Sequence, residues 1–236
     1  MRRILSIVLP LCFVCLFCGS AVAQLATVEP AERHSYKIDI KIDFDRLSYT
    51  GTQIVRWVNN GEKPTSVIYF HLYPNLRTGD QPAATTAANV EADEPRLDIV
   101  EVRAASDNSA LYSALEDQGT SLRVNLRESI PPGSAMNIFM RFKGSVPEID
   151  RDETSLTTHV VKQVSAALRS DREMRRARDI NFRCRGVMLL GTAYPALTVR
   201  DDDEWRRKLE PSVGDFVFNE AAEYEVTVTA AAGVEV

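Results

Sequence analysis

The sequence predicts a mainly β protein, an antiparallel β-sandwich with one helical insertion. Three observations support this fold class. Several segments alternate apolar and polar residues, as strands with one buried face do. Clusters of the turn-forming residues Pro, Gly and Asn separate these segments. One stretch, from Ser155 to about Arg178, instead has apolar residues at the three- and four-residue steps of an amphipathic helix.

The first three strands are predicted near the start of this domain. Apolar residues alternate with Lys and Asp from Tyr36 to Phe44. A second strand is expected from Gly51 to Val58, where Asn59-Asn60-Gly61 supplies a turn, so the two strands should form a hairpin. The segment from Ser66 to Tyr73 is almost continuously apolar and is flanked by prolines, which is typical of a central strand.

The remaining strands follow a long polar connection. The stretch from Leu76 to Pro95 is rich in Ala, Thr and acidic residues and has no apolar period, so we expect an exposed loop. Further strands are predicted at Leu97–Val102, Leu122–Leu126 and Ile138–Phe142. The last predicted strand lies at Tyr224–Val228. This spacing suits an antiparallel sandwich.

The N-terminus has the pattern of a secretory signal peptide. Two arginines precede the apolar stretch Ile4–Phe17, and the small-residue site Ala21-Val22-Ala23 follows. We therefore expect residues 1–23 to be removed and the domain to cover residues 24–236, exported to the periplasm or secreted. The apolar stretch is shorter than the ~20 residues of a spanning helix. No membrane span is expected after signal cleavage.

Charge and cysteine content limit the partners of the mature domain. Cleavage leaves Cys184 as the single cysteine, so no internal disulfide is expected. The net charge of −5 falls to −7, because 26 Lys and Arg then face 33 Asp and Glu. This acidic balance argues against a nucleic-acid partner. Seven arginines between positions 169 and 185 leave an anion-binding patch open, but a solvated helix face explains them better.

Three ordered stretches together resemble a known family. They are Gly51-Thr52 followed by Phe70–Asn75, Pro132-Gly133 leading through Ile138–Phe142 to Gly144 and Pro147, and Tyr194-Pro195 followed by Asp201–Trp205, Gly214–Phe216 and Glu220–Thr227. In this order the stretches are similar to the N-terminal domain of zinc aminopeptidases of the aminopeptidase N and leukotriene-hydrolase kind, particularly their bacterial exported branch. The resemblance spans nearly the whole predicted mature chain.

The resemblance implies a saddle-like, non-catalytic β-sandwich. In such enzymes zinc is held by H-E-x-x-H and a distant Glu in the following domain, because residues at i and i+4 share a helix face. Here His34, His71 and His159 are followed by Ser, Leu and Val, so no H-E pair exists. We therefore expect no catalytic residue, no metal ligand and no cofactor in this chain. Zinc is expected only in a catalytic metallopeptidase domain, the implied partner in cis or in trans.

The resemblance also implies three substrate-lining residues, namely Gly186, Met188 and Tyr194. Family members place a Gln or Glu a few residues before the corner that Tyr194-Pro195 resembles, where it holds the amino group of the substrate. An ungapped comparison puts this position at Gly186, and no Gln, Glu or Asp occurs from Phe182 to Pro195. Either the alignment slips at this position or the specificity of this chain differs from that of the family.

Other candidate sites have weaker patterns. His71 lies in an apolar strand and is expected to be structural; a zinc site with His159 and Cys184 is the alternative, although the three share no ligand spacing. The acidic run Asp201–Glu204 lacks the pattern of a calcium loop, so a solvated turn is expected. Cys184 has no nucleophile motif around it and is expected to be buried and inert.

The sequence leaves several functions open. The leading hypothesis is a domain that packs against a catalytic domain absent from this chain and shapes its cleft. The sequence stops at Val236, just after a predicted strand, from which we expect a truncated reading frame or a split gene. The alternatives are a free-standing exported binding module, part of an active metallopeptidase whose catalytic part is encoded downstream, and a complete enzyme with an unrecognised site.

Overall fold

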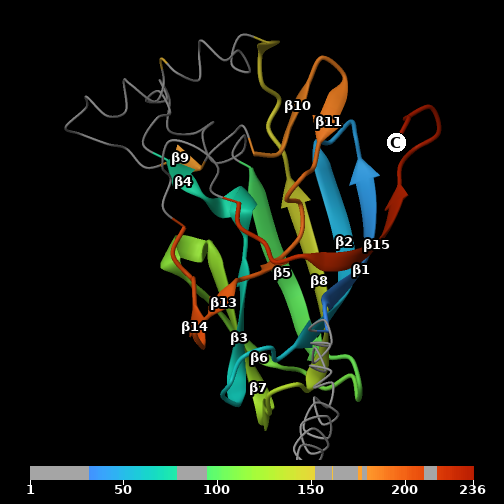
Figure 1. The fold of residues 1–236 in the computed structure, drawn as a ribbon. Coiled ribbons are helices and arrows are strands. Elements are labelled where there is room, and N and C mark those ends of the chain that lie inside the picture. Colours follow the sequence, from blue (N-terminus) through green and yellow to red (C-terminus); the bar gives the residue numbers. More distant parts are fainter. Residues whose placement is uncertain (1–31, 79–94, 152–160, 162–174, 177–179, 210–216) are drawn as a thin grey trace, which may run out of the picture. The chain divides into compact units, whose positions relative to one another are not determined.

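The computed structural model contains two main β-sheets (Figure 1). Apolar side chains from both sheets form one shared core. The described residues are 32–78, 95–151, 161, 175–176, 180–209 and 217–236. The larger sheet has the strand order β15(Ala222–Thr229), β1(His34–Asp43), β2(Ser48–Val58), β8(Ala135–Ser145), β5(Arg96–Ala104). Antiparallel pairs join β1, β2, β8 and β5. The mainly β, sandwich-like fold class is confirmed.

The smaller sheet and three short ladders complete the described part. The smaller sheet has the order β12(Ala196–Leu197), β3(Thr65–His71), β7(Ser121–Ile130), β6(Tyr112–Glu116). The ladders are β10(Phe182–Cys184) with β11(Val187–Leu189), β13(Arg200–Asp201) with β14(Glu204–Trp205), and β4(Arg77–Thr78) with β9(Arg175–Arg176). Two short 3₁₀ turns are η1(Tyr73–Asn75) and η2(Asp117–Gly119).

The core lies between the two main sheets. In β1 the side chains of Ile38 and Ile40 are buried, whereas Lys37, Asp39 and Lys41 alternate with them on the opposite face. The same alternation in β3, β7 and β8 buries further aromatic and aliphatic residues, and the largest of these are Ile68, Phe70, Leu122, Ile138, Met140 and Phe142. Burial of these apolar faces is the main favourable contribution to folding.

The predicted strands are confirmed with small shifts at their ends, except for two features. The strand β6 was not predicted, because Tyr112 and Leu115 are exposed and its sequence shows no clear alternation. The last strand, β15, is found but pairs with β1 in the parallel direction. The predicted antiparallel arrangement therefore does not extend to this one pair of strands. A sequence pattern fixes which residues face the core, not the direction of the neighbouring strand.

Several predictions fall on residues that the structure does not describe. They include the signal peptide at residues 1–23, most of the loop from Leu76 to Pro95 and nearly all of the helix expected at 155–178. At the end of that predicted helix, Arg175–Arg176 form the short strand β9, because their backbone pairs with Arg77–Thr78. Among the described residues, no helix has the length and apolar character needed to cross a bilayer.

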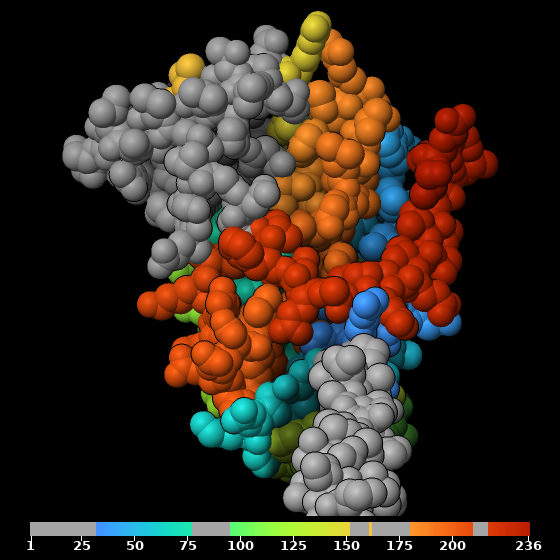
Figure 2. Space-filling model, in the orientation of Figure 1, coloured from blue at the N-terminus to red at the C-terminus, as the bar shows by residue number. Residues whose placement is uncertain are grey.

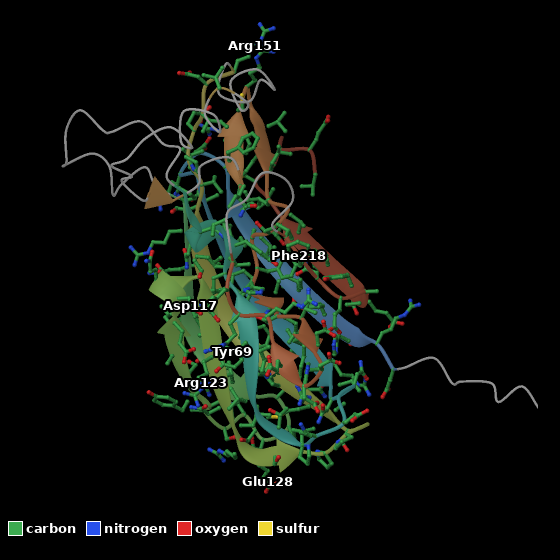
Figure 3. The ribbon with its side chains drawn as sticks, turned by 60° about the vertical axis from the view of Figure 1, so that its left-hand side comes forward. Tyr69, Asp117, Arg123, Glu128, Arg151 and Phe218 are labelled. Carbon is green, nitrogen blue, oxygen red and sulfur yellow. The ribbon has the colours of Figure 1, made fainter. Side chains whose placement is uncertain are left out.

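The segment from Ala193 to Thr198 connects the two main sheets. On the larger sheet, the Gln53 side-chain amide donates a hydrogen bond of 3.0 Å to the Pro195 carbonyl. The Leu197 N–H donates to the Tyr36 hydroxyl at 2.8 Å. On the smaller sheet, the Thr198 N–H donates to the carbonyl of Tyr69 in β3 at 3.0 Å; Tyr69 is labelled in Figure 3. Buried polar groups are costly unless bonded, so these bonds fix the position of the segment.

In the acidic run after this segment, Asp201, Asp202 and Glu204 are exposed as expected for a solvated turn, but Asp203 is not. The Asp203 side chain is only 12% exposed and forms an ion pair of 2.8 Å with Arg200, which is 9% exposed. Its Oδ1 also accepts hydrogen bonds from the backbone N–H groups of Glu62 and Lys63. Arg200 in turn donates to the Asn59 side chain. The carboxylate anchors the turn after β2, and the prediction of a solvated turn is wrong at this residue.

Two glycines make room for aromatic rings in the larger sheet. Gly51 is directly opposite Phe142, and Gly144 is directly opposite Tyr49. A Cβ atom at either glycine would overlap the ring across from it. The rings lie close to the space that a Cβ atom would take, so a larger residue at either position would collide with them. Both aromatic side chains are fully buried as a result.

We expect Asp203→Asn to lower the free energy of unfolding by about 2 kcal/mol, because it leaves the buried Arg200 guanidinium without its counter-charge. Asp202→Asn is the matched control, since Asp202 is exposed and both positions have a positive φ that Asn tolerates. The control should change stability by less than about 0.5 kcal/mol. Urea unfolding followed by tryptophan fluorescence measures both variants, and equal effects would contradict the anchoring role.

We expect Gly144→Ala to destabilise the fold by about 2 kcal/mol, because the new methyl group displaces the buried Tyr49 ring. Gly191→Ala is the control: an added Cβ at Gly191 meets no atom within 4 Å, and its φ is not positive. The midpoints of thermal unfolding of the two variants should differ by several degrees. Similar midpoints would show that the ring moves aside at no cost.

Candidate functional site

An apolar groove lies at the β15 edge of the larger sheet. Its volume is about 730 Å³. It is formed by the core-facing side of β1 and β15, the hairpin of β10 and β11, and the chain after β15. The lining residues are Ile38, Ile40, Ile42, Phe44, Gly186, Val187, Met188, Leu190, Tyr194, Tyr224, Val226, Val228, Gly233, Val234, Glu235 and Val236.

The groove forms because the core does not extend to the last strand. In β1, Ile38 is 1% exposed, yet its partner Val226 in β15 is 51% exposed on the same face of the sheet. Likewise Tyr36 is 5% exposed and its partner Tyr224 is 46% exposed. The face of the sheet that is buried in the core at β1 is thus about half exposed to solvent at β15. Exposed apolar surface of this kind often marks an interaction site.

Two tyrosines, Tyr194 and Tyr224, form the polar end of the groove, and both pack against the buried Tyr36. The rings of Tyr36 and Tyr224 are stacked at 4.7 Å with an interplanar angle of 4°, and Tyr194 meets both rings edge-on. The hydroxyls of Tyr194 and Tyr224 lie 3.3 Å apart, within hydrogen-bond distance. Burial raises the pKa of both Tyr36 and Tyr194 above the ordinary value, so their hydroxyls stay neutral donors and acceptors.

The three residues that the family resemblance implies as substrate-lining come together in this groove. Met188 and Tyr194 contribute side chains, and Gly186 lines it with backbone alone. Gly186 has φ 76° and Arg185 has φ 52°, as in a two-residue type I′ turn between β10 and β11. The left-handed backbone favours glycine, which explains why no Gln or Glu stands there. Their role toward a substrate stays a prediction.

Sequence reasoning missed the β15 side of the groove. Tyr224 and Val226 were recognised as strand residues, but their pairing with β1 joins positions nearly 190 residues apart. The alternation of apolar and acidic residues was the available signal, since it gives β15 one apolar face. The groove contains one charged side chain among the described residues, that of Glu235. It is therefore suited to binding apolar groups rather than to acid–base chemistry.

A histidine beside the groove holds the start of β15. The Nδ1 atom of His34 accepts a hydrogen bond of 3.1 Å from the Val58 N–H, so its Nε2 atom is the one that donates, to Glu220 at 2.9 Å. This hydrogen bond is the largest cause of a lowered pKa at the Glu220 carboxyl. Glu220 also accepts from the Arg200 N–H. The pair ties the segment before β15 to β1.

The alternative zinc ligands are placed separately. His71 is buried in β3 and Cys184 is half-buried in β10, in a different ladder, while His159 lies outside the described residues. The expectation that Cys184 is buried therefore holds only in part, because the residue is of intermediate exposure. Within the described ranges, no group of three or more His, Cys, Asp and Glu side chains is arranged to hold a metal ion.

Burial controls the titration of His71. Its ring is 2% exposed and lies 5.3 Å from the ring of Tyr73, centre to centre. Loss of solvation lowers its pKa from 6.5 to about 4, although a hydrogen bond with the Arg206 backbone and the nearby Asp117 both favour the charged form. The Nδ1 atom has no hydrogen-bond partner among the described residues. His71 is thus a neutral core residue at neutral pH, in line with its expected structural role.

Comparison with known proteins finds similarity at the level of structure. No family model matches the chain, and no curated protein matches it. An M1 zinc metallopeptidase from Deinococcus radiodurans is similar with a TM-score of 0.34 and 12% identity, over 50% of this chain and 21% of that one. A two-domain M1 zinc metallopeptidase mutant bound to L-tryptophan gives 0.33, with the same identity and coverage. The matched part is about a fifth of those proteins.

We expect His71 to make the fold less stable as the pH falls below its ordinary pKa. The pKa of His71 is about 4 in the folded state and 6.5 in the unfolded state. Between these pH values the unfolded chain is protonated at His71 and the folded chain is not. Stability is therefore retained above pH 6.5 and lost on acidification, by about 2 kcal/mol between pH 7.5 and pH 5. In His71→Gln, which does not titrate, the loss over this range should be smaller by that amount. Urea unfolding at several pH values measures it, and parallel profiles would contradict it.

Proposed function

We propose that this chain is a non-catalytic domain of an exported zinc aminopeptidase-like protein. In this proposal it packs against a catalytic metallopeptidase domain, in cis or in trans, and shapes one side of the cleft. The ordered resemblance of three stretches of the sequence to such a domain supports the proposal. The chemistry would be supplied by zinc bound in the catalytic domain, and this chain would bind no metal of its own.

One observation carries the proposal: Gly186, Met188 and Tyr194 line a single apolar groove. The resemblance singles out these residues without reference to the groove, which also contains parts of β1 and β15. A flexible Met side chain and a tyrosine hydroxyl at one end would let the groove accept different apolar side chains. The stretch from Phe182 to Pro195 contains no Gln, Glu or Asp, which fits a domain that shapes a cleft more than one that anchors the substrate terminus.

A free-standing exported binding module is the second candidate. The exposed apolar face at β15 favours it, because Tyr224 and Val226 offer a binding surface that needs no catalytic domain. A chain that belongs to an active metallopeptidase encoded further along the same locus is a variant of the first proposal. Export to the periplasm or beyond is part of both candidates and is supported by the N-terminal sequence pattern alone.

The first experiment examines the DNA flanking the gene. A reading frame with H-E-x-x-H within a further domain's length would support the first proposal, and its absence would favour the binding module. The encoded catalytic domain is then co-expressed with this chain. We expect a stable complex that releases amino acids from aminoacyl p-nitroanilides, contains zinc and loses activity with a chelator.

We expect the chain alone to release no amino acid, with or without added zinc. Within the complex, Met188→Lys should lower kcat/KM at least about tenfold, because a charge in the apolar groove disturbs the cleft. Val100→Lys is the matched control, since Val100 is 53% exposed and lies in β5, at the opposite edge of the larger sheet. Zinc-dependent turnover by the purified chain alone would overturn the non-catalytic role.

A further inference from the structure

The strand β15 forms an edge of the larger sheet. It pairs with β1 on one side, and in the described part of the chain no strand pairs with its other side. Figure 1 shows it outermost beside β1, and Figure 2 shows it at the surface in that view. An edge strand presents backbone N–H and C=O groups at the spacing of a β-ladder, which is a template for another extended segment.

The two faces of β15 are chemically different. Tyr224 and Val226 lie on the groove side and are about half exposed, whereas Glu223 and Glu225 lie on the opposite face and are exposed. A strand added beside β15 would continue the sheet and place every second side chain over the groove. These side chains would cover Tyr224 and Val226, which the core leaves uncovered. They therefore need to be apolar.

The acidic residues of β15 favour particular side chains on the face of the added strand that points away from the groove. Residues 217–236 contain four Glu and no Lys or Arg. Glu225 forms an ion pair of 2.7 Å with Lys37, and Glu220 is bonded to His34. Among the described residues, no ion pair involves Glu223. Lys or Arg directly across from Glu223 and Glu225 would form favourable cross-strand pairs, while acidic residues there would be repelled.

We propose that the free edge of β15 binds an extended strand of a partner protein in which apolar side chains alternate with Lys or Arg. The backbone supplies the hydrogen bonds, the groove accepts the apolar side chains, and the acidic face selects the basic ones. A second copy of this chain fits less well, because two β15 edges would bring their acidic faces together. The inference goes beyond the proposed function and does not depend on a catalytic domain.

The test uses the purified chain and a fluorescein-labelled ten-residue peptide that alternates Val and Lys, followed by fluorescence anisotropy at low ionic strength. Two control peptides separate the causes of binding. One has the same composition with five Val followed by five Lys, and the other alternates Val and Glu. We expect the alternating Val and Lys peptide to bind at least about tenfold tighter than either control, because it alone matches both period and charge.

Variants of the chain locate the binding site. Glu223→Lys should weaken binding of the Val and Lys peptide about tenfold, because one attractive pair becomes repulsive. Glu128→Lys makes the same charge change on an exposed residue of β7, far from Phe218 and the start of β15 (Figure 3), and should leave binding unchanged. Val226→Thr keeps the shape but replaces a methyl with a hydroxyl, and should weaken binding severalfold. Thr227→Val, on the acidic face, should not.

Three results would overturn the proposal. The first is no saturable binding of the alternating peptide, and the second is equal binding of the block peptide, which would indicate charge attraction without strand addition. The third is a dimer of the chain, seen by analytical ultracentrifugation, that Val226→Thr dissociates, because the edge would then be taken by a second copy. Measurement of the circular dichroism of each variant shows that it is folded. None of these results bears on zinc-dependent activity of a complex.

Discussion

The structure depends on the hydrogen bonds that hold the segment from Ala193 to Thr198 between the two sheets. Gln53 and Tyr36 bind it from the larger sheet, and the backbone of Tyr69 binds it from the smaller one. All are buried contacts over more than 120 residues of sequence, so they close long loops of the chain. Once this segment is fixed, the residues that follow Thr198 can reach fewer positions on the two sheets.

The groove follows from that constraint. Tyr194 enters the groove from the same segment, and Arg200 just beyond it bonds Glu220 through its backbone N–H. Glu220 in turn is held by His34, so β15 starts beside β1. The parallel pairing is the result of this route. The chain contacts both sheets before it pairs with β1. The core does not extend as far as β15, so the apolar face of β15 is partly exposed.

Local chemistry explains what the sequence predicted well. The alternation in β1 and β15 and the apolar run in β3 identified strands and their buried faces, because these patterns depend on neighbouring residues alone. The buried role of Asp203 was not visible, since its partners Glu62 and Lys63 are about 140 residues away. For the same reason the groove was anticipated only through Gly186, Met188 and Tyr194, which came from family resemblance. The pairing of β15 with β1 forms the second wall of the groove. It joins residues that are far apart in the sequence, so no local pattern predicts it.

The glycines opposite Phe142 and Tyr49 have a consequence for how the chain finds its alignment. The strands β2 and β8 are eleven residues each and pair over their whole length, so neighbouring alignments would offer almost as many backbone bonds. Sliding β8 by two residues keeps the correct face inward but would set both rings against residues with full side chains. The gaps above Gly51 and Gly144 therefore favour the observed alignment of β2 with β8 over its neighbours two residues away.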